Sequence, residues 1–239
     1  PDWITRELPD FVARRRWLQR RRPDLTDALV TTRAEGQLVT SLAPLTADRA
    51  DALLRRLFDE GEFLGPHGIR SLSAAYRGGV TLDVAGVSMS VAYDPGESTT
   101  NLFGGNSNWR GPVWFPINVL LIDGLRGHAV AAGGRREVEY PTGSGRTRGL
   151  GEAADDLEQR LVALFRPDAH GRRPGTPRDH PRGPLWDVPV TFAEYFDGDT
   201  GRGCGASHQT GWSALVAHLI CSSGGLRPPE TPRNGAPGP

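Results

Sequence analysis

The segment NLFGGNSNWRGPVWFPINVLLIDGL, from Asn101 to Leu125, constrains the fold more strongly than any other part of the chain. Its second half, from Pro116 onward, is apolar almost all the way round a helix, and Trp212 to Ile220 has the same character. Helices of this kind are buried on every side. Pro116 suits the first turn of a helix, because its missing N–H would have no helical partner there. We therefore expect two inner helices, each preceded by a turn-rich segment.

Two other segments have the spacing of half-exposed helices. From Thr46 to Phe58 the apolar residues recur every three or four positions, and residues 157–165 repeat this pattern. Alternation of wholly apolar and amphipathic helices is what a two-layered helical toroid requires, with the first kind inside and the second outside. The sequence thus predicts an all-α fold. The stretch from Thr81 to Tyr93 alternates like a short β-hairpin and is expected to decorate the barrel mouth.

Composition excludes several classes of partner. The 239 residues carry 28 acidic and 28 basic residues, so the formal net charge is zero and favours neither nucleic acid nor an anionic membrane surface. All the basic residues are arginine, which we interpret as the codon bias of a GC-rich bacterial genome. No apolar run reaches about 18 residues, the length that would predict a transmembrane helix. With no signal peptide visible, the expected location is the cytoplasm.

The remaining composition bears on cysteines and disorder. Cys204 and Cys221 are too few for a disulfide framework, so two reduced thiols are expected. Residues from Gly224 to Pro239 are rich in proline and glycine and have little to bury, which predicts a disordered tail. The structured part should therefore be residues 1–223.

The part of the opening segment from Asn101 to Asn118 also has the composition of a sugar-binding site. It holds two tryptophans, an arginine and four side-chain amides. Indole faces stack on the apolar face of a pyranose ring, while amide and guanidinium groups offer directional hydrogen bonds to its hydroxyls. The alternative is a loop-to-helix junction whose polar side chains cap backbone groups. Composition alone leaves both interpretations open.

A second motif, FAEYFDGDTGRGCGASHQTGW from Phe192 to Trp212, places Glu194 among aromatic residues. Together the two motifs resemble glycoside hydrolase family 63, the group of processing α-glucosidases and their bacterial relatives, and most closely its bacterial branch. The resemblance runs from roughly Trp3 to Ile220 and includes LLRRLFDEGEFLGPHGIRSLS, YDPGEST and YPTGSG. It implies an (α/α)6 barrel, of which residues 1–223 would form the C-terminal half of the catalytic domain.

The resemblance also implies a mechanism. Hydrolysis of a glycosidic bond needs two carboxyl groups, and in an inverting enzyme one of them is a base that activates water. Glu194 matches the family's base, whereas the family's acid is an Asp upstream of this chain. The other carboxylates near the motifs are expected to play different parts: Asp94 and Glu97 as a subsite or loop-fixing element, Asp197 and Asp199 as turn residues. This chain alone should therefore be weak or inactive as a hydrolase.

Sugar-binding roles follow from the same resemblance. Trp109 and Arg110 match the element WRGP that lines the family's innermost subsite, and Trp114 and Asn118 come next along the chain. Three further residues at the expected barrel mouth complete the predicted substrate-binding set: His208, Gln209 and Trp212. His208 has a structural alternative, and Trp212 could equally belong to the core.

Other chemistries lack their motifs. There is no phosphate-binding loop, no HExxH zinc motif and no GxSxG serine motif, so no metal and no cofactor are expected. The predicted function is an exo-acting α-glucosidase-like hydrolase acting on an oligosaccharide or disaccharide, completed by the N-terminal part of the same catalytic domain. Two alternatives remain: a non-catalytic carbohydrate-binding or interaction fragment, and trehalase- or mannosylglycerate-type specificity.

Overall fold

The structure is a computed structural model of the 239-residue chain. It describes residues 6–26, 29–34, 37–42, 46–100, 108–176, 183 and 190–223. The predicted disordered tail and residues 101–107 of the first motif lie outside the described residues. The chain divides into two compact units. Unit 1 contains Pro1–Leu64 and Leu121–Ala154, and unit 2 contains Gly65–Leu120 and Asp155–Pro239.

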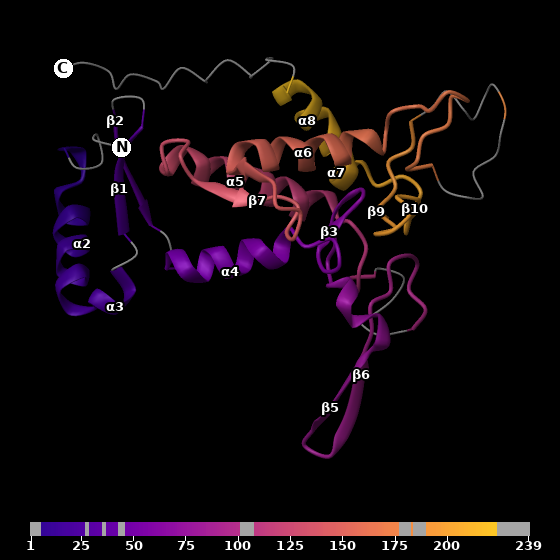
Figure 1. The fold of residues 1–239 in the computed structure, drawn as a ribbon, viewed down its shortest axis with the longest axis horizontal. Coiled ribbons are helices and arrows are strands. Elements are labelled where there is room, and N and C mark those ends of the chain that lie inside the picture. The colour runs from indigo at the N-terminus through magenta and orange to yellow at the C-terminus, as the bar shows by residue number, and fades with distance from the viewer. Residues whose placement is uncertain are drawn as a thin grey trace. The chain divides into compact units, whose positions relative to one another are not determined.

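The described residues form helices and short two-stranded sheets (Figure 1). The helices are α2 (Pro9–Arg21), α3 (Pro23–Thr26), α4 (Ala47–Leu57), η1 (Ala74–Gly78), α5 (Phe115–Ala131), α6 (Leu150–Ala163), α7 (Thr210–Ser213) and α8 (Leu215–Ser223). The strands pair as β1 (Leu29–Ala34) with β2 (Gln37–Leu42), β3 (Leu64–Gly65) with β4 (Gly68–Ile69), β5 (Val80–Val84) with β6 (Val87–Val91), β7 (Glu137–Glu139) with β8 (Thr147–Gly149), and β9 (Tyr195–Phe196) with β10 (Gly203–Cys204).

The all-α prediction is therefore too narrow, since the described residues include five two-stranded sheets. Most of these strands were missed for a physical reason: two or three residues cannot display the alternation by which a strand is recognised in a sequence. The helix predicted from Thr46 to Phe58 is confirmed as α4, and the hairpin predicted from Thr81 to Tyr93 is confirmed as β5 and β6.

The expectation that Pro116–Leu125 is buried on every side is wrong for the described residues. α5 does cover this segment, with Ile122 and Leu125 in the core, but Ile117 and Leu120 are exposed. The described part of the chain therefore covers only one side of α5. Within the same part, no helix is both long enough and apolar enough to cross a bilayer.

In unit 1, α4 is fixed to the turn that follows β7. The rings of Phe58 and Tyr140 meet edge to face, with centroids 4.9 Å apart, and both residues are fully buried. The Thr142 N–H donates to the Phe58 carbonyl oxygen (2.9 Å), and its hydroxyl donates to the Arg55 carbonyl oxygen (2.7 Å). These bonds use carbonyls at the end of α4 that have no partner within the helix.

Unit 2 contains the core on which both sequence motifs rest. Phe115, Phe165 and Phe196 pack against one another with ring centroids 5.4 to 5.7 Å apart. Leu157 and Leu161 of α6 are buried in the same unit. Because Phe115 comes from the first motif and Phe196 from the second, this cluster holds the two motifs together.

The β5–β6 hairpin has two chemically different faces. Its register pairs Val80 with Val91, Leu82 with Met89 and Val84 with Val87, which places these six apolar residues on one face. The connecting residues Ala85 and Gly86 both have positive φ, as a two-residue hairpin turn requires. Leu82 and Met89 are 61% and 51% exposed, so the described residues leave the apolar face largely uncovered.

Candidate active site

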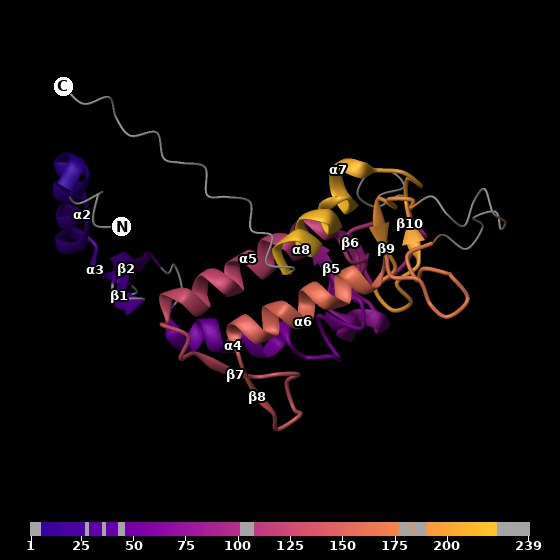
Figure 2. The ribbon, with the colours of Figure 1, turned by 90° about the horizontal axis from the view of Figure 1, so that it is seen from above.

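The two motifs meet in a small patch of paired backbone. The Val113 N–H donates to the Phe196 carbonyl oxygen (2.8 Å), and the Phe196 N–H donates back to Val113 (3.0 Å). On the other side of this bridge, β9 pairs with β10, Tyr195 opposite Cys204 (Figures 1 and 2). The backbone therefore brings Glu194, which directly precedes β9, into the same patch as the WRGP element.

Four aromatic rings form a stack in this patch. Trp114 lies between Trp109, whose ring is 4.0 Å away and almost parallel, and Tyr195, whose ring is 4.7 Å away. Trp212 packs against Trp114 at a tilt, with centroids 5.1 Å apart. Trp114 is 1% exposed and its indole N–H donates to the Asn108 carbonyl oxygen, whereas Trp109 is 40% exposed. Trp109 is thus the most exposed ring of the stack.

Arg110 is held by protein groups. Its guanidinium lies 2.8 Å from Asp94, and both side chains are largely buried. The Thr99 N–H and hydroxyl donate to the same Asp94 carboxylate. Asp94 therefore fixes the loop that it belongs to, in agreement with the loop-fixing interpretation. A direct contact between Arg110 and a sugar would have to share the guanidinium with this ion pair.

Asn118 is also fully engaged by the backbone. Its side-chain oxygen accepts the Ile69 N–H (2.7 Å), and its side-chain nitrogen donates to the carbonyl oxygens of Ile69 and Trp114 (3.0 Å each). The residue is 1% exposed. These bonds fix the start of α5 to β4, so Asn118 would have to break them to reach a substrate.

Glu194 is half-buried and is tied to the turn that follows β10. Its backbone N–H donates to the Ala206 carbonyl oxygen (2.9 Å), and its carboxylate Oε2 accepts the Ala206 N–H (3.0 Å). Gly205 lies next to this contact and has a φ of +69°. A Cβ on Gly205 would lie 2.7 Å from Glu194 Oε2 and 2.6 Å from Tyr195 Cε1. Only glycine lets the backbone approach the carboxylate this closely.

A second carboxylate, that of Glu97, binds the same turn. Its Oε1 accepts the Gly205 N–H (3.0 Å) and its Oε2 accepts the Tyr195 hydroxyl (3.1 Å). Burial raises the pKa of the Tyr195 phenol, and the charge of Glu97 raises it further, so the phenol stays protonated as a donor. Sequence reasoning missed the roles of Tyr195 and Gly205. The glycine-rich turn GRGCG was the one signal that the chain needed close backbone approach here.

The turn between β9 and β10 uses its two aspartates differently. The Asp197 carboxylate accepts the N–H groups of Asp199 and Thr200, which confirms it as a turn residue. The expectation for Asp199 is wrong: its carboxylate accepts the Tyr93 hydroxyl (2.9 Å) and pairs with Arg77 (2.7 Å). Asp199 thus fixes distant side chains, a contact across 106 residues that local sequence cannot show.

His208 and Gln209 come at the start of α7. His208 is exposed, and its ring lies 5.6 Å from that of Phe192. The Gln209 N–H donates to the Phe192 carbonyl oxygen (2.6 Å), and the Ser213 hydroxyl donates to the Ala193 carbonyl oxygen (2.6 Å). The start of α7 is thereby fixed to Phe192 and Ala193, the two residues that precede Glu194.

Neither cysteine of the chain is in a disulfide. Burial raises the pKa of the Cys204 thiol to about 12, so it is protonated at neutral pH and poorly reactive. Among the described residues, no group of three or more His, Cys, Asp or Glu side chains is arranged to hold a metal ion. The expectation that the protein uses no metal stays a prediction.

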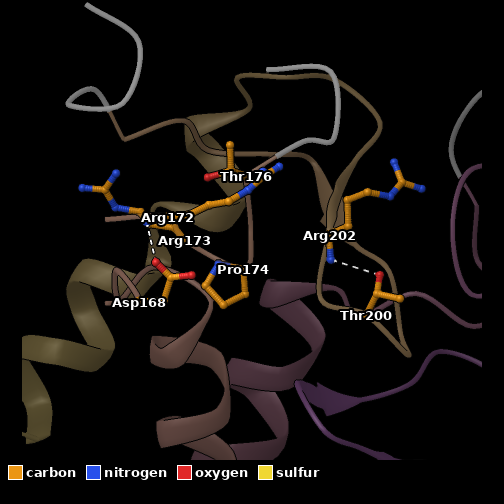
Figure 3. Close-up of a pocket in the computed structure, with 7 residues that line it drawn as sticks. All are labelled: Asp168, Arg172, Arg173, Pro174, Thr176, Thr200 and Arg202. Atoms are coloured by element: carbon orange, nitrogen blue, oxygen red, sulfur yellow. Dashed lines mark hydrogen bonds between the residues drawn. The ribbon is translucent and has the colours of Figure 1, made fainter. Parts of the chain in front are cut away.

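A pocket of about 220 Å³ is lined by the loop of residues 168–176 and by the turn between β9 and β10 (Figure 3). Its lining residues are Asp168, Arg172, Arg173, Pro174, Thr176, Thr200 and Arg202. The Asp168 carboxylate accepts the N–H groups of His170 and Arg172, so it shapes the loop. The Arg172 and Arg202 side chains point away from each other in Figure 3. Because these guanidinium groups do not converge, we assign no ligand to this pocket.

Comparisons with known proteins show which family the chain is similar to. The model of one family, described as the mannosylglycerate hydrolase MGH1-like glycoside hydrolase domain, matches residues 13–213. The chain is also 43% identical over 229 residues to the uncharacterized protein YMR196W of Saccharomyces cerevisiae. This alignment covers 92% of this chain and 21% of that protein.

Two relatives with described activities are more distant. A probable mannosyl-oligosaccharide glucosidase of Schizosaccharomyces pombe is 25% identical over 185 residues, 77% of this chain and 16% of that protein. A mannosyl-oligosaccharide glucosidase of Saccharomyces cerevisiae is 28% identical over 119 residues, 49% of this chain and 11% of that protein. The chain thus spans no more than about a fifth of the length of these relatives. All three come from yeasts, so the bacterial branch stays a prediction.

Proposed function

Because the chain belongs to the family of MGH1-like glycoside hydrolase domains, we propose that it supplies the catalytic base of an inverting glycosidase that removes an α-linked glucosyl group. The observation that carries this proposal is the position of Glu194. Its carboxylate is fixed on the Ala206 N–H, in the same patch as an aromatic stack that ends in the exposed Trp109. Activation of water beside a bound sugar requires a positioned carboxylate near the sugar-binding surface.

Glu194 would act by taking a proton from a water molecule that attacks the anomeric carbon. A carboxylate has about four lone-pair positions. The Ala206 bond orients Oε2 and uses one of these positions. The base must be ionised to take the proton from water. Orientation by a rigid backbone group is also what keeps a base aligned with its water.

The general acid is proposed to be an Asp in the N-terminal part of the same catalytic domain. In inverting glycosidases the two carboxyl groups stand roughly 6.5–9.5 Å apart, which leaves room for the water. Glu97 is a poor candidate because its two oxygens already accept hydrogen bonds from Gly205 and Tyr195. A carboxylate that accepts hydrogen bonds on both oxygens is badly placed to donate a proton.

The sugar-binding residues divide into two groups in this proposal. Trp109, His208 and Gln209 are exposed or half-buried and would touch the sugar, with Trp212 at the edge of the stack. The buried residues Arg110, Trp114 and Asn118 would act by holding these contacts in place. We also propose that the N-terminal part of the catalytic domain supplies the remaining helices of an (α/α)6 barrel, and that the protein is cytoplasmic.

A second candidate is specificity for a mannosylglycerate-type substrate. It is favoured by the description of the matching family, whereas the two glucosidase relatives favour an α-glucosyl substrate. Both candidates use the same base and the same aromatic stack. They differ only in the sugar and in what is attached to it.

The test is hydrolysis by the full-length protein that contains this chain. Wild type, Glu194→Gln and a control Glu137→Gln, which changes an exposed residue of β7, are compared on α-glucosyl disaccharides and on mannosylglycerate. We expect glucose to be released first as the β-anomer, which NMR detects before mutarotation. The Glu194→Gln change should remove nearly all of the rate and the control should keep it. Full activity of Glu194→Gln would exclude Glu194 as the base.

A further inference from the structure

Two carboxylates bind consecutive peptide groups of one turn. Glu97 Oε1 accepts the Gly205 N–H and Glu194 Oε2 accepts the Ala206 N–H, each at 3.0 Å. The two glutamates are far apart in sequence, and only one of them occupies the position expected for the base. The turn of Gly205 and Ala206 therefore transmits any displacement of Glu97 directly to the partner of Glu194.

The second oxygen of Glu97 reaches the residue next to Glu194. It accepts the Tyr195 hydroxyl at 3.1 Å, and Tyr195 is fully buried with its ring against Trp114. The contacts close a ring that runs from Glu194 to Ala206, Gly205, Glu97 and Tyr195 and returns to Glu194 through the peptide bond. Each member of this ring is linked to two others, so the Glu194 carboxylate is held by the Ala206 N–H and its backbone by the link to Tyr195.

The backbone on the N-terminal side of Glu97 is fixed by three hydrogen bonds. The Asn108 side chain donates to the carbonyl oxygens of Asp94 (2.7 Å) and Gly96 (2.8 Å). The Gly198 N–H donates to the Pro95 carbonyl oxygen (2.9 Å). The loop that carries Glu97 is thus anchored to both sequence motifs, although Glu97 itself is exposed. The backbone bonds already anchor this loop. The two bonds of the Glu97 side chain instead reach Gly205 and Tyr195, which adjoin the candidate base and its partner.

We propose that Glu97 is a positioning residue for the glycosidase reaction, which orients Glu194 through the Gly205–Ala206 turn and the Tyr195 phenol. This inference rests on the proposed function of Glu194 as the base. It assigns Glu97 no contact with the substrate and no proton transfer. Its loss should therefore lower kcat and leave KM almost unchanged, because the sugar is bound by other residues.

The experiment uses the full-length protein and the substrate that it hydrolyses. Glu97→Gln keeps the size of the side chain but replaces one acceptor oxygen by a donor, so it cannot accept from both Gly205 and Tyr195. We expect kcat to fall about 10- to 100-fold, the effect of a small misplacement of a catalytic group, with KM changed less than about 2-fold. Glu137→Gln on β7 is the matched control for the loss of one exposed carboxylate and should keep the wild-type values.

Tyr195→Phe provides the second arm. It removes only the hydroxyl that donates to Glu97 and keeps the ring in the stack. We expect a smaller fall in kcat, about 3- to 10-fold, and a double variant no slower than Glu97→Gln alone, because the two groups act through one contact. If Glu97→Gln fails to fold, full activity of Tyr195→Phe still overturns the proposal.

Substrates with good and poor leaving groups separate positioning from acid catalysis. A positioning residue for the base lowers the rate on an α-glucosyl fluoride and on a disaccharide by the same factor. A general acid at Glu97 would spare the fluoride, whose departure needs no protonation, and that result would overturn the proposal. Unchanged kcat in Glu97→Gln would also overturn it. Full activity of Glu194→Gln would instead refute the proposed function, whatever Glu97 does.

Discussion

Trp109 and Trp114 stack face to face, with ring centroids 4.0 Å apart and planes only 2° from parallel. The two rings have different roles because their exposure differs, 40% for Trp109 and 1% for Trp114. The buried ring contributes to stability, and the exposed ring remains accessible to a ligand. Two substitutions in one stack can therefore separate folding from binding.

Trp114→Ala should destabilise the protein strongly. It removes a fully buried indole that packs on Trp109, Tyr195 and Trp212, and it leaves the Asn108 carbonyl oxygen without its donor. Large-to-small changes of buried aromatic residues cost about 3–5 kcal/mol. Urea denaturation followed by circular dichroism measures the change. A loss below about 1 kcal/mol, well under that range, would mean that the ring is not part of the core.

Trp109→Ala should destabilise the protein less than Trp114→Ala and should weaken substrate binding. Losing one sugar-stacking face is expected to raise KM about 3- to 10-fold, the equivalent of ~0.5–1.5 kcal/mol. Trp17→Ala on α2, at a residue that is 56% exposed, is the matched control and should leave KM unchanged. Equal KM values for wild type and Trp109→Ala would exclude the ring as a sugar platform.

Gly205→Ala should impair both folding and activity. Its φ of +69° disfavours any side chain, and the added Cβ would lie 2.7 Å from the Glu194 carboxylate and 2.6 Å from the Tyr195 ring. Gly143→Ala is a control with a similar φ of +81° and nothing within 4 Å of the added Cβ. We expect about 1 kcal/mol of destabilisation for the control and about 1–3 kcal/mol more for Gly205→Ala. Equal losses in the two variants would show that the contact with Glu194 is easily relieved.

Local patterns predicted α4 and parts of α5, α6 and α8, but they predicted neither α2 nor β1 and β2, nor the strands of two or three residues. Residues 46–58 repeat their apolar positions over three turns, so α4 was identified to within a residue or two. β9 and β10 have two residues each, and β9 is also bridged at Phe196 to Val113, which is far away in the sequence. Such pairing depends on tertiary contacts that no window of sequence contains.

The candidate site shows the same limit. Residue types alone suggested that the tryptophans could bind a sugar, whereas Glu194 was singled out by the resemblance of its motif to a known family. It could not see that Asn118 is bonded to Ile69, 49 residues away, or that Glu97 reaches Gly205, 108 residues away. The directions in which polar side chains find their partners are set by the fold. The structure shows which of the candidate residues are exposed and which are buried, and composition alone could not show this.

Asp199→Asn should destabilise the protein at neutral pH and much less in acid. Burial alone would raise the pKa of Asp199, but hydrogen bonds from Arg77 and Tyr93 outweigh it and lower the pKa below the usual value of 3.8. The stability from the ionised form is therefore fully present above that unfolded value and is lost as pH falls through the lower folded value.

Hydrogen bonds to charged groups contribute about 1.5–3 kcal/mol, so we expect a difference of about 2 kcal/mol between wild type and Asp199→Asn at pH 7. Denaturation curves from pH 7 to pH 2 measure how this difference shrinks. Asp83→Asn, at an exposed residue of β5, is the control and should show little difference at any pH. A difference for Asp199→Asn that stays constant down to pH 2 would contradict the ionic origin of the effect.

The apolar face of the β5–β6 hairpin should make the isolated chain self-associate. Six apolar residues share that face, and the two in its middle, Leu82 and Met89, are more than half exposed. Contiguous exposed apolar surface of this kind favours association. The double change Leu82→Thr and Met89→Thr keeps β-propensity, so it should reduce association without loss of the hairpin. Sedimentation velocity at several concentrations measures the effect.

The control changes the opposite face, Thr81→Ser with Ser90→Thr, and should associate like wild type. Equal association of all three proteins would show that the associating surface lies elsewhere.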